Sequence, residues 1–370
     1  MRPGREGLVL TAGWLAGFAL LARLPGLTRR TGAHTDPEAR LSVVIPARNE
    51  EGNLGRLLGS LARQRPSPAE VIVVDDRSSD ATAGLARRAG ATVLVGAETP
   101  PGWSGKCWAC HQGAKAAEGS RLVFLDADVT LSPDALWRLV GEHDRRGGLV
   151  SVAPFHRTER GYERLSAVAN LVALMGTGAF AVLPGSPAMA FGPCMITGAD
   201  DYRRVGGHAH PEVRGEVAED VALAGRFRAL GLPVSVLAGR EAVTFRMYPD
   251  GPRQLIEGWT RLLASGAERT PLVLRAAIGL WITAALTAAS GLLHARRSRT
   301  ALAWYGAFSL QMWWMLRRVG RFGPLSALAF PLPLSTFVAL FARSAWHRLL
   351  GRPPIWRGRR MPATVSRSRS

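Results

Sequence analysis

Two aspartates stand one residue apart at the end of an apolar run. The run RLVFLDAD begins as a buried strand and ends in Asp126 and Asp128. On an extended strand, residues two apart point to the same face, so both carboxylates are expected to address one ligand. Divalent cations held by carboxylates usually share their coordination shell with substrate phosphates. We therefore predict a metal or phosphate-linked site here, with a structural surface pair as the alternative.

A second acidic cluster, VVDDRSSDAT, follows another apolar run. Asp80 and the two serines before it are expected to cap the next helix. Capping does not explain Asp75 and Asp76, which a ligand hydroxyl or base N–H can use. The first apolar run ends similarly in IPARNEE, which leaves Glu50 at a turn.

Three further charged residues stand in motifs that can do chemistry. Lys106 follows the flexible turn GWSG, which can bring backbone N–H groups near phosphates; the alternative is a solvated loop lysine. Asp220, in GEVAEDVALAGRF, can take a proton as a general base. Its neighbour Glu219 is expected to pair with an arginine such as Arg214 or Arg226.

The histidines and cysteines do not form a metal-binding pattern. His208 and His210 have no third histidine close by, so we expect loop residues or acceptor contacts. Cys107 and Cys110 read CWAC without a second pair at ligand spacing, which predicts ordinary small residues. Together with Cys194 they give an odd count without a disulfide framework, which fits a reducing compartment.

The elements that must position these residues alternate between strands and helices. The expected strands have both faces apolar, as in a parallel sheet, and cover residues 41–46, 70–76, 91–96 and 121–128. Helical spacing of apolar residues marks 50–63, and 80–89 is also expected to be helical. The fold class predicted is α/β, a doubly wound, mainly parallel sheet whose ligands collect at the carboxyl ends of its strands.

Apolar segments flank this region. Leu8–Leu24 is expected to be an uncleaved anchor, and three segments at 271–293, 300–316 and 324–342 are expected to be transmembrane or interfacial helices. The apolar stretch after Leu165 is expected to form a surface or interfacial helix, followed by a strand at 189–197.

The formal net charge of +19 comes almost entirely from arginine. The arginines gather at the edges of the apolar segments, as in membrane proteins, and no nucleic-acid-binding motif is present. We therefore expect a membrane partner and no nucleic acid.

Four motifs in order, VVIPARNEE, VVDDRSSDAT, FLDAD and GEVAEDVALAGRF, resemble the family 2 glycosyltransferases. These are inverting enzymes of the GT-A fold that use nucleotide sugars, and the likeness covers about residues 41–265. Further segments, among them PPGWSGKCWACHQGA, VTFRMYPDG and PIWRGRRM, are similar to a membrane-bound branch that includes the carotenoid (4,4'-diaponeurosporenoate) glycosyltransferases. Hopanoid-associated enzymes are near this branch.

The resemblance implies a role for each motif residue in donor binding. Pro46 and Glu50 would border the nucleotide. One of Asp75 or Asp76 would contact the uracil or ribose, and the choice between them stays open. Asp126 would lie against the ribose and phosphate.

The resemblance also implies that Asp128 coordinates Mg²⁺ or Mn²⁺ and that Asp220 is the general base. Arg246 and Trp259 would close over the donor or meet the acceptor, as would Glu219, although Trp259 can equally be a membrane-interface anchor. The chain has Arg48 where the family often has Tyr, which puts a ring contact to the base in doubt. The Q-x-x-R-W motif of processive synthases is absent, since the matching tryptophan stands in EGWTR.

The expected domains are an anchor at 1–28, a linker at 29–40, a GT-A domain at 41–265, membrane helices at 266–345 and a basic tail at 346–370. We expect an inverting, metal-dependent transfer of sugar from a nucleotide sugar, UDP-linked by resemblance, to a lipid acceptor such as a carotenoid or terpenoid acid or alcohol. If the acceptor is already a carboxylate, Asp220 would matter less for removing a proton. The expected location is the cell membrane, multi-pass, with the catalytic domain in the cytoplasm. Alternatives are a hopanoid or polyprenoid lipid acceptor, a nucleotidyltransferase, and a catalytically silent membrane scaffold.

Overall fold

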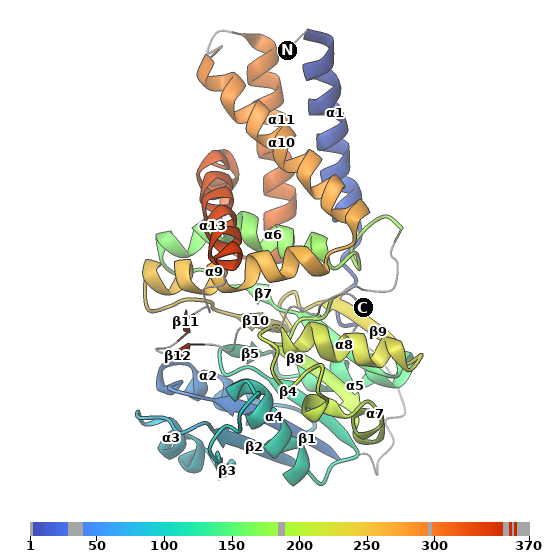
Figure 1. Cartoon of the computed structure of the whole chain (residues 1–370), viewed down its shortest axis with the longest axis vertical. Coiled ribbons are helices and arrows are strands. Elements are labelled where there is room, and N and C mark those ends of the chain that lie inside the picture. The colour runs from blue at the N-terminus through green and yellow to red at the C-terminus, as the bar shows by residue number, and fades with distance from the viewer. Residues whose placement is uncertain are drawn as a thin grey trace. The chain divides into compact units, whose positions relative to one another are not determined.

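The computed structural model describes residues 3–28, 40–183, 189–294, 298–350, 355–356 and 359–360 (Figure 1). The chain forms two compact units. Unit 1 comprises Met1–Pro25, His156–Ala188 and Met247–Trp356, and unit 2 comprises Gly26–Phe155, Met189–Arg246 and Arg357–Ser370. The expected linker lies, except for Arg40, outside the described residues, as do residues 361–370 of the expected tail.

Unit 2 is built on a seven-stranded sheet in the order β3-β2-β1-β4-β8-β6-β9. The strands are β1 (Leu41–Ala47), β2 (Glu70–Asp75), β3 (Thr92–Val95), β4 (Arg121–Leu125), β6 (Leu149–Ala153), β8 (Cys194–Gly198) and β9 (Val234–Ala238). Neighbouring strands pair in parallel except β8, which runs antiparallel to both β4 and β6. The mainly parallel α/β sheet is therefore confirmed, and β2 and β4 both deliver aspartates at their carboxyl ends.

The helices of unit 2 are α2 (Glu51–Leu61), α3 (Thr82–Arg88), α4 (Gly105–Ala116), α5 (Ala135–Arg146), α7 (Ala199–Arg204), α8 (Glu219–Ala229) and the 3-10 helix η2 (Gly207–Ala209). The leucines that predicted α2 from their spacing are buried in the structure. Ser104 starts α4 by accepting a hydrogen bond from the Cys107 N–H, which is how an N-cap satisfies a free donor. Two short strands, β5 (Val129–Leu131) and β10 (Val243–Phe245), pair antiparallel, and β7 (Phe155–His156) belongs to the same small sheet.

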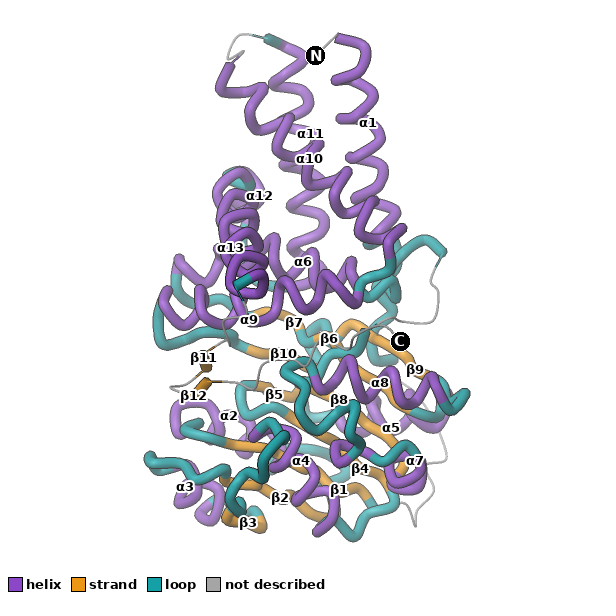
Figure 2. Tube along the Cα trace, viewed as in Figure 1, coloured by secondary structure: helices purple, strands orange, loops and turns teal. Residues whose placement is uncertain are grey.

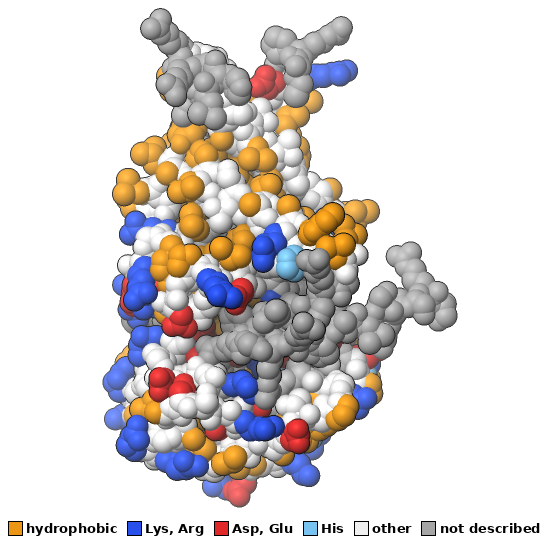
Figure 3. All heavy atoms as spheres, turned by 60° about the vertical axis from the view of Figure 1, so that its left-hand side comes forward, with side chains coloured by type: hydrophobic (Ala, Val, Ile, Leu, Met, Phe, Trp, Pro, Cys, Tyr) orange, Lys and Arg blue, Asp and Glu red, His pale blue; other side chains and the backbone are white. Residues whose placement is uncertain are grey.

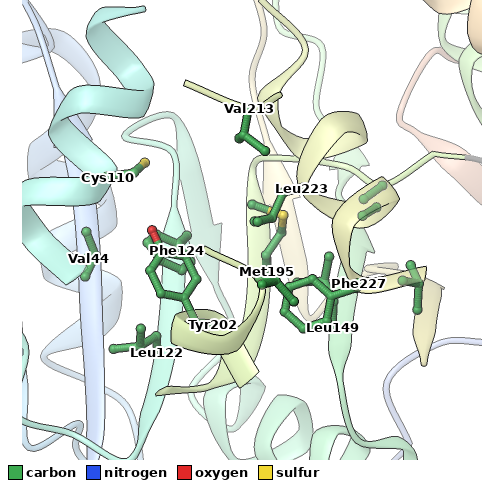
Figure 4. Packing of buried hydrophobic residues seen from close by; sticks show 14 of the residues in the cluster. Val44, Cys110, Leu122, Phe124, Leu149, Met195, Tyr202, Val213, Leu223 and Phe227 are labelled. Atoms are coloured by element: carbon green, nitrogen blue, oxygen red, sulfur yellow. The ribbon is translucent and has the colours of Figure 1, made fainter. Parts of the chain in front are cut away.

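An apolar core beside the central strands holds α4, α7 and α8 on the sheet of unit 2 (Figure 4). The rings of Phe124 and Tyr202 lie 5.3 Å apart in it. Cys107 and Cys110 are buried in the same core, and Cys194 is buried in β8. All three are free thiols, and the core positions of Cys107 and Cys110 fit the prediction of ordinary small residues.

Unit 1 is helical, as the purple tubes of Figure 2 show. Its helices are α1 (Pro3–Leu20), α6 (Ala167–Gly176), α9 (Pro252–Arg269), α10 (Leu272–His294), α11 (Arg299–Val319), α12 (Pro324–Leu328), α13 (Pro331–Leu349) and the 3-10 helix η1 (Gly161–Ser166). The short strands β11 (Ile355–Trp356) and β12 (Arg359–Arg360) follow in the chain.

A buried glutamine joins three of these helices. Gln311 of α11 accepts a hydrogen bond from Trp281 Nε1 of α10 at 2.9 Å and donates one to the Trp14 carbonyl of α1 at 2.6 Å. A Cβ at Gly13 would collide with Ala284, so α1 can approach α10 closely only because Gly13 has no side chain. Small residues and interhelical hydrogen bonds of this kind are typical of helices packed in a membrane.

Two predicted elements differ in extent from the structure. The apolar segment 324–342 is broken between α12 and α13, because Pro331 and Pro333 fit only the first turn of a new helix. The strand expected at 189–197 begins only at Cys194, because residues 191–193 take part in contacts outside the ladder. In the described part of the chain, one helical segment, Leu272–Gly291, is long and apolar enough to cross a membrane.

Candidate active site

The Asp126–Asp128 pair lies in a turn and not on an extended strand. β4 ends at Leu125, and the Asp126 carbonyl accepts a hydrogen bond from the Val129 N–H at 3.2 Å. The expectation that strand pleating aims both side chains at one ligand is therefore wrong. The chain must reverse within three residues to enter β5, and this turn brings the two carboxylates close by another route.

Three carboxylates are near enough to repel one another at this turn. The pKa of Asp128 is raised to about 8, first by burial and then by the charges of Asp126 and Glu50. One oxygen of Asp128, Oδ1, is buried without a hydrogen-bond partner. Glu50 precedes α2 and accepts a hydrogen bond from Asn53 Nδ2 at 2.9 Å. A buried carboxylate oxygen with no donor beside two like charges is an environment that favours a cation.

Lys106 supplies one such positive charge. Its Nζ lies 2.7 Å from Asp126 Oδ1 and 2.7 Å from Glu219 Oε1. Burial alone would lower the pKa of Lys106, but the two carboxylates raise it well above its ordinary value. Lys106 is therefore a charged bridge between the first turn of α4, the Asp126 turn and α8. The alternative of a solvated loop lysine is wrong.

The prediction that Glu219 pairs with an arginine is also wrong. Its carboxylate is 5% exposed and pairs with Lys106, whereas Arg226 lies 3.5 Å from Glu212. Lys106 and Glu219 are both in the first turns of helices whose starts converge, so Lys106 and not an arginine pairs with Glu219. Glu219 thereby belongs to the charged cluster and not to the surface of α8.

Asp220 is held by two backbone amides. Its Oδ2 accepts a hydrogen bond from the Gly192 N–H at 2.7 Å, and its Oδ1 accepts one from its neighbour Val221 at 2.9 Å. Burial, followed by the charge of Glu219, raises the pKa of Asp220 to about 7. A carboxyl group with a pKa near neutrality is well suited to general-base catalysis.

The ends of β1 and β2 carry the second acidic pair. Asp75 ends β2 with Oδ1 buried and without a hydrogen-bond partner, whereas Asp76 Oδ2 lies 3.3 Å from Arg48. Pro46 lies opposite Val74 in the β1–β2 ladder. Asp75 therefore has a free acceptor for a ligand donor, while Asp76 is engaged by the residue that replaces the family's frequent tyrosine.

Asp80 contacts the starts of two helices, but the N-cap of α3 is Ala81 and not the expected Asp80 or serine. Asp80 Oδ1 accepts a hydrogen bond from the N–H of Thr82, the first residue of α3, at 3.0 Å, and its Oδ2 accepts one from the Glu51 N–H at 3.1 Å. The second bond ties the start of α2 to the start of α3, which fixes the turn that carries Glu50.

The sequence singled out three further residues. Trp259, on α9 of unit 1, is 4% exposed and donates from Nε1 to Ser166 Oγ at 3.0 Å, so the interface-anchor alternative is wrong. His208 is also buried, 2.7 Å from the Tyr202 hydroxyl, and burial lowers its pKa to about 3; it is a core residue and not a loop residue. Arg246 follows β10 in unit 2, and its proposed role stays a prediction.

The sequence reasoning missed the segment that links the two halves of the cluster. Gly192 donates to Asp220, and the Pro193 carbonyl accepts a hydrogen bond from the Asp126 N–H at 3.0 Å. The only signal was a Gly-Pro pair at the start of an apolar strand, which ordinarily indicates a turn.

These residues fit a divalent cation that shares its shell with a substrate. In the described ranges, no three His, Cys, Asp or Glu side chains are grouped so as to hold a metal ion by themselves. The buried, unpartnered Oδ1 of Asp128 nevertheless fits one position in such a shell. Mg²⁺ and Mn²⁺ commonly take one or two carboxylates and complete their shell with phosphates and water.

Comparison with known proteins identifies the family of the chain. The family model for glycosyl transferase family 2 matches residues 42–196. The 4,4'-diaponeurosporenoate glycosyltransferases of Staphylococcus aureus strains USA300 and MRSA252 are each 38% identical over 315 residues, covering 82% of this chain and 83% of theirs. A mannosyltransferase from Pyrobaculum calidifontis, solved with GDP-Man and Mn²⁺, has the same fold, with a TM-score of 0.53 at 20% identity over 93% of this chain and 95% of its own. The chain thus belongs to glycosyl transferase family 2 and is a glycosyltransferase.

Proposed function

We propose that the protein transfers a sugar from a UDP-linked donor to a membrane-dissolved carotenoid or related terpenoid acid. The observation that carries this proposal is the cluster at the carboxyl ends of β2 and β4. It joins a buried, unpartnered Asp128 oxygen, a lysine bridge and a carboxyl group with a pKa near 7. The name of the Staphylococcus aureus relatives supports an acceptor of the carotenoid carboxylate class.

The donor would lie along the rim of the sheet. Asp75 would accept a hydrogen bond from the base or ribose, with Pro46 and Glu50 bordering the nucleotide. Lys106 would lie near the diphosphate, where its ammonium group offsets charge that develops on the leaving group. The free acceptor of Asp75 favours it over Asp76 for the base contact.

Asp128, with Asp126 beside it, would hold Mg²⁺ or Mn²⁺. When bound, such a cation neutralises negative charge on the departing diphosphate. The buried Asp128 carboxyl, whose pKa is raised to about 8, would be ionised more readily beside it.

Sugar transfer needs an acceptor oxygen to attack the anomeric carbon while the bond to the diphosphate breaks. A hydroxyl acceptor must lose its proton, and Asp220 would take it as a general base. A carboxylate acceptor has no proton to lose, so Asp220 would then serve chiefly to orient the acceptor. Glu219, held by Lys106, would keep the start of α8 in place.

Exposed apolar side chains support a membrane location for unit 1. Among the described residues, all exposed large hydrophobic side chains except Val95 and Leu230 belong to unit 1. They recur along α10, α11, α12 and α13, and Figure 3 shows apolar side chains gathered over α10 and α11. Exposed large apolar side chains that recur along four helices are unusual on a protein surrounded by water. We propose that α10 crosses the bilayer, that further helices of unit 1 contact lipid, and that unit 2 is cytoplasmic.

The donor and acceptor are tested by incubating the purified protein in lipid with labelled nucleotide sugars. UDP-glucose, other UDP-sugars and GDP-mannose are compared, each with a carotenoid acid, a carotenoid alcohol and a hopanoid alcohol. We expect labelled carotenoid ester from a UDP-sugar. Transfer of nucleotide in place of sugar, or labelling of the hopanoid alone, would contradict the proposal.

Variants in the same assay test the site. Asp128→Ala should abolish transfer, and adding Mn²⁺ should not restore it. Asp200→Ala, a change at an exposed aspartate on α7, should keep both the transfer rate and its dependence on Mn²⁺. Unchanged transfer by Asp128→Ala would exclude the metal assignment.

The membrane location is tested separately by carbonate extraction of membranes that contain the protein. We expect the protein to stay in the pellet, as an integral protein does. Its release into the supernatant would rule out a crossing by α10.

A further inference from the structure

Residues 191–193 form a short backbone segment that contacts both the proposed base and the proposed metal turn. Gly192 donates its N–H to Asp220 Oδ2 at 2.7 Å. The next residue, Pro193, accepts a hydrogen bond through its carbonyl from the Asp126 N–H at 3.0 Å. The position of this segment therefore sets the position of two acidic groups on different elements.

Ser151 holds the first residue of this segment. Ser151 is fully buried on β6, in the otherwise apolar strand LVSVA. Its hydroxyl oxygen accepts the Phe191 N–H at 2.6 Å, and its O–H donates to the Phe191 carbonyl at 3.0 Å. One side chain thus satisfies both backbone polar groups of Phe191 and fixes the peptide planes on either side of it. Polar groups buried in a sheet usually have such a specific reason.

Asp220 depends on this segment more than Asp126 does. Within the described residues, the Gly192 N–H is the hydrogen bond that ties Asp220 to an element other than its own helix. Asp126 is also placed by the β4–β8 ladder just before it, where Leu125 pairs with Cys194, and by its own turn to Val129. A shift of residue 191 should therefore displace Asp220 first.

The charged cluster leaves little room for a side chain at position 192. A Cβ there would lie 3.1 Å from both Glu219 Oε1 and Lys106 Nζ. The segment therefore passes directly beside the lysine bridge, and its path is restricted from the side of the charged cluster as well as from β6.

We propose that Ser151 is a positioning residue for sugar transfer, acting on Asp220 through the backbone of Phe191 and Gly192. This inference rests on the proposed function, in which Asp220 orients a carboxylate acceptor and takes the proton of a hydroxyl acceptor. Ser151 itself contacts neither donor nor acceptor. A misplacement of a reacting group by about 1 Å can slow a reaction by roughly 100-fold.

The experiment compares Ser151→Ala with Ser42→Ala, using a hydroxyl acceptor. Ser42 is an equally buried serine on a strand of the same sheet, and it loses a comparable set of hydrogen bonds, to Glu70 and from Gly119. We expect Ser151→Ala to lower kcat on the order of 10-fold with the donor KM changed less than about twofold. Ser42→Ala should lower the unfolding temperature similarly but keep kcat. Ser151→Thr, which retains a hydroxyl, should recover most of the kcat.

Asp220→Asn is measured alongside and separates failure of the inference from failure of the proposed function. Equal kcat values in Ser151→Ala and Ser42→Ala, with Asp220→Asn inactive, would overturn the inference and leave the function intact. A fully active Asp220→Asn would overturn both the inference and the role of Asp220 as general base, whereas the absence of sugar transfer by the parent protein would overturn the proposed function itself. A rise in donor KM without a fall in kcat would place the effect at Asp126 and would also overturn the inference.

Discussion

Replacing Lys106 by methionine should destabilise unit 2 and stop transfer. The substitution keeps most of the aliphatic stem and removes the ammonium group that lies 2.7 Å from carboxylates of both Asp126 and Glu219. Two like charges would then face each other across the start of α8 without the cation between them. The chain has one other lysine, Lys115, exposed near the end of α4, and Lys115→Met is the matched control.

The size of the effect follows from the burial of the three side chains. Removing one partner of a fully buried ion pair costs about 3–5 kcal/mol, because it leaves an uncompensated charge. Glu219 is 5% exposed and approaches this limit, but Lys106 and Asp126 are 34% and 28% exposed, so solvent screens part of the loss. We therefore expect a loss of about 2–3 kcal/mol, or a fall of roughly 5–10 °C in unfolding temperature for a unit of this size.

Thermal unfolding followed by tryptophan fluorescence in detergent measures this difference at pH 7.5. Adding Glu219→Gln to Lys106→Met should restore at least half of the lost stability, because the buried charge that has no counter-ion is then absent. Unfolding of Lys106→Met at the temperature of Lys115→Met would refute the view that the bridge stabilises the cluster. Failure of the double variant to recover would show that the loss comes from packing and not from charge.

Three further outcomes are expected. A base must be ionised, and the pKa of Asp220 is raised to about 7, so kcat with a hydroxyl acceptor should rise with pH through about 7 and level off above it. With a carboxylate acceptor, kcat should show no such rise. Identical pH profiles of kcat for the two acceptors would argue against a proton transfer to Asp220. Gly192→Ala should lower activity at least several-fold by crowding the lysine bridge, whereas Gly198→Ala, whose Cβ meets open space, should match the parent in a transfer assay. Trp259→Phe removes the buried hydrogen bond to Ser166 and should lower the unfolding free energy by about 1 kcal/mol in chemical denaturation, with the donor KM unchanged; a raised donor KM would instead favour direct contact with the donor.

The strands and the rim position of the acidic residues were predictable from the sequence. Runs of apolar residues on both faces mark buried parallel strands, and chemistry-bearing residues must follow where those strands end. Asp75 and Asp126 were found in this way because their placement is a local property of the chain.

The partners of the charged residues were not predictable in the same way. Lys106 and Glu219 are far apart in sequence, and only the convergence of two helix starts brings them together. Reasoning from the sequence alone favours arginines that are near Glu219 in the chain as its ion-pair partners. Ser151 gave no signal, since a single serine in an apolar strand does not tell which backbone its hydroxyl meets. Tertiary contacts of this kind depend on strand order, and β8 enters the sheet antiparallel between β4 and β6.

The burial of all three cysteines has a practical consequence for labelling. Burial raises the pKa of the Cys194 thiol to about 12 and those of Cys107 and Cys110 well above their usual range, so little thiolate is present at neutral pH. Maleimides and nitroxide reagents react with the thiolate and should leave the native chain unmodified. A single cysteine placed on an exposed helix of unit 1 would then carry a probe whose immersion depth in lipid can be measured without removing any native residue.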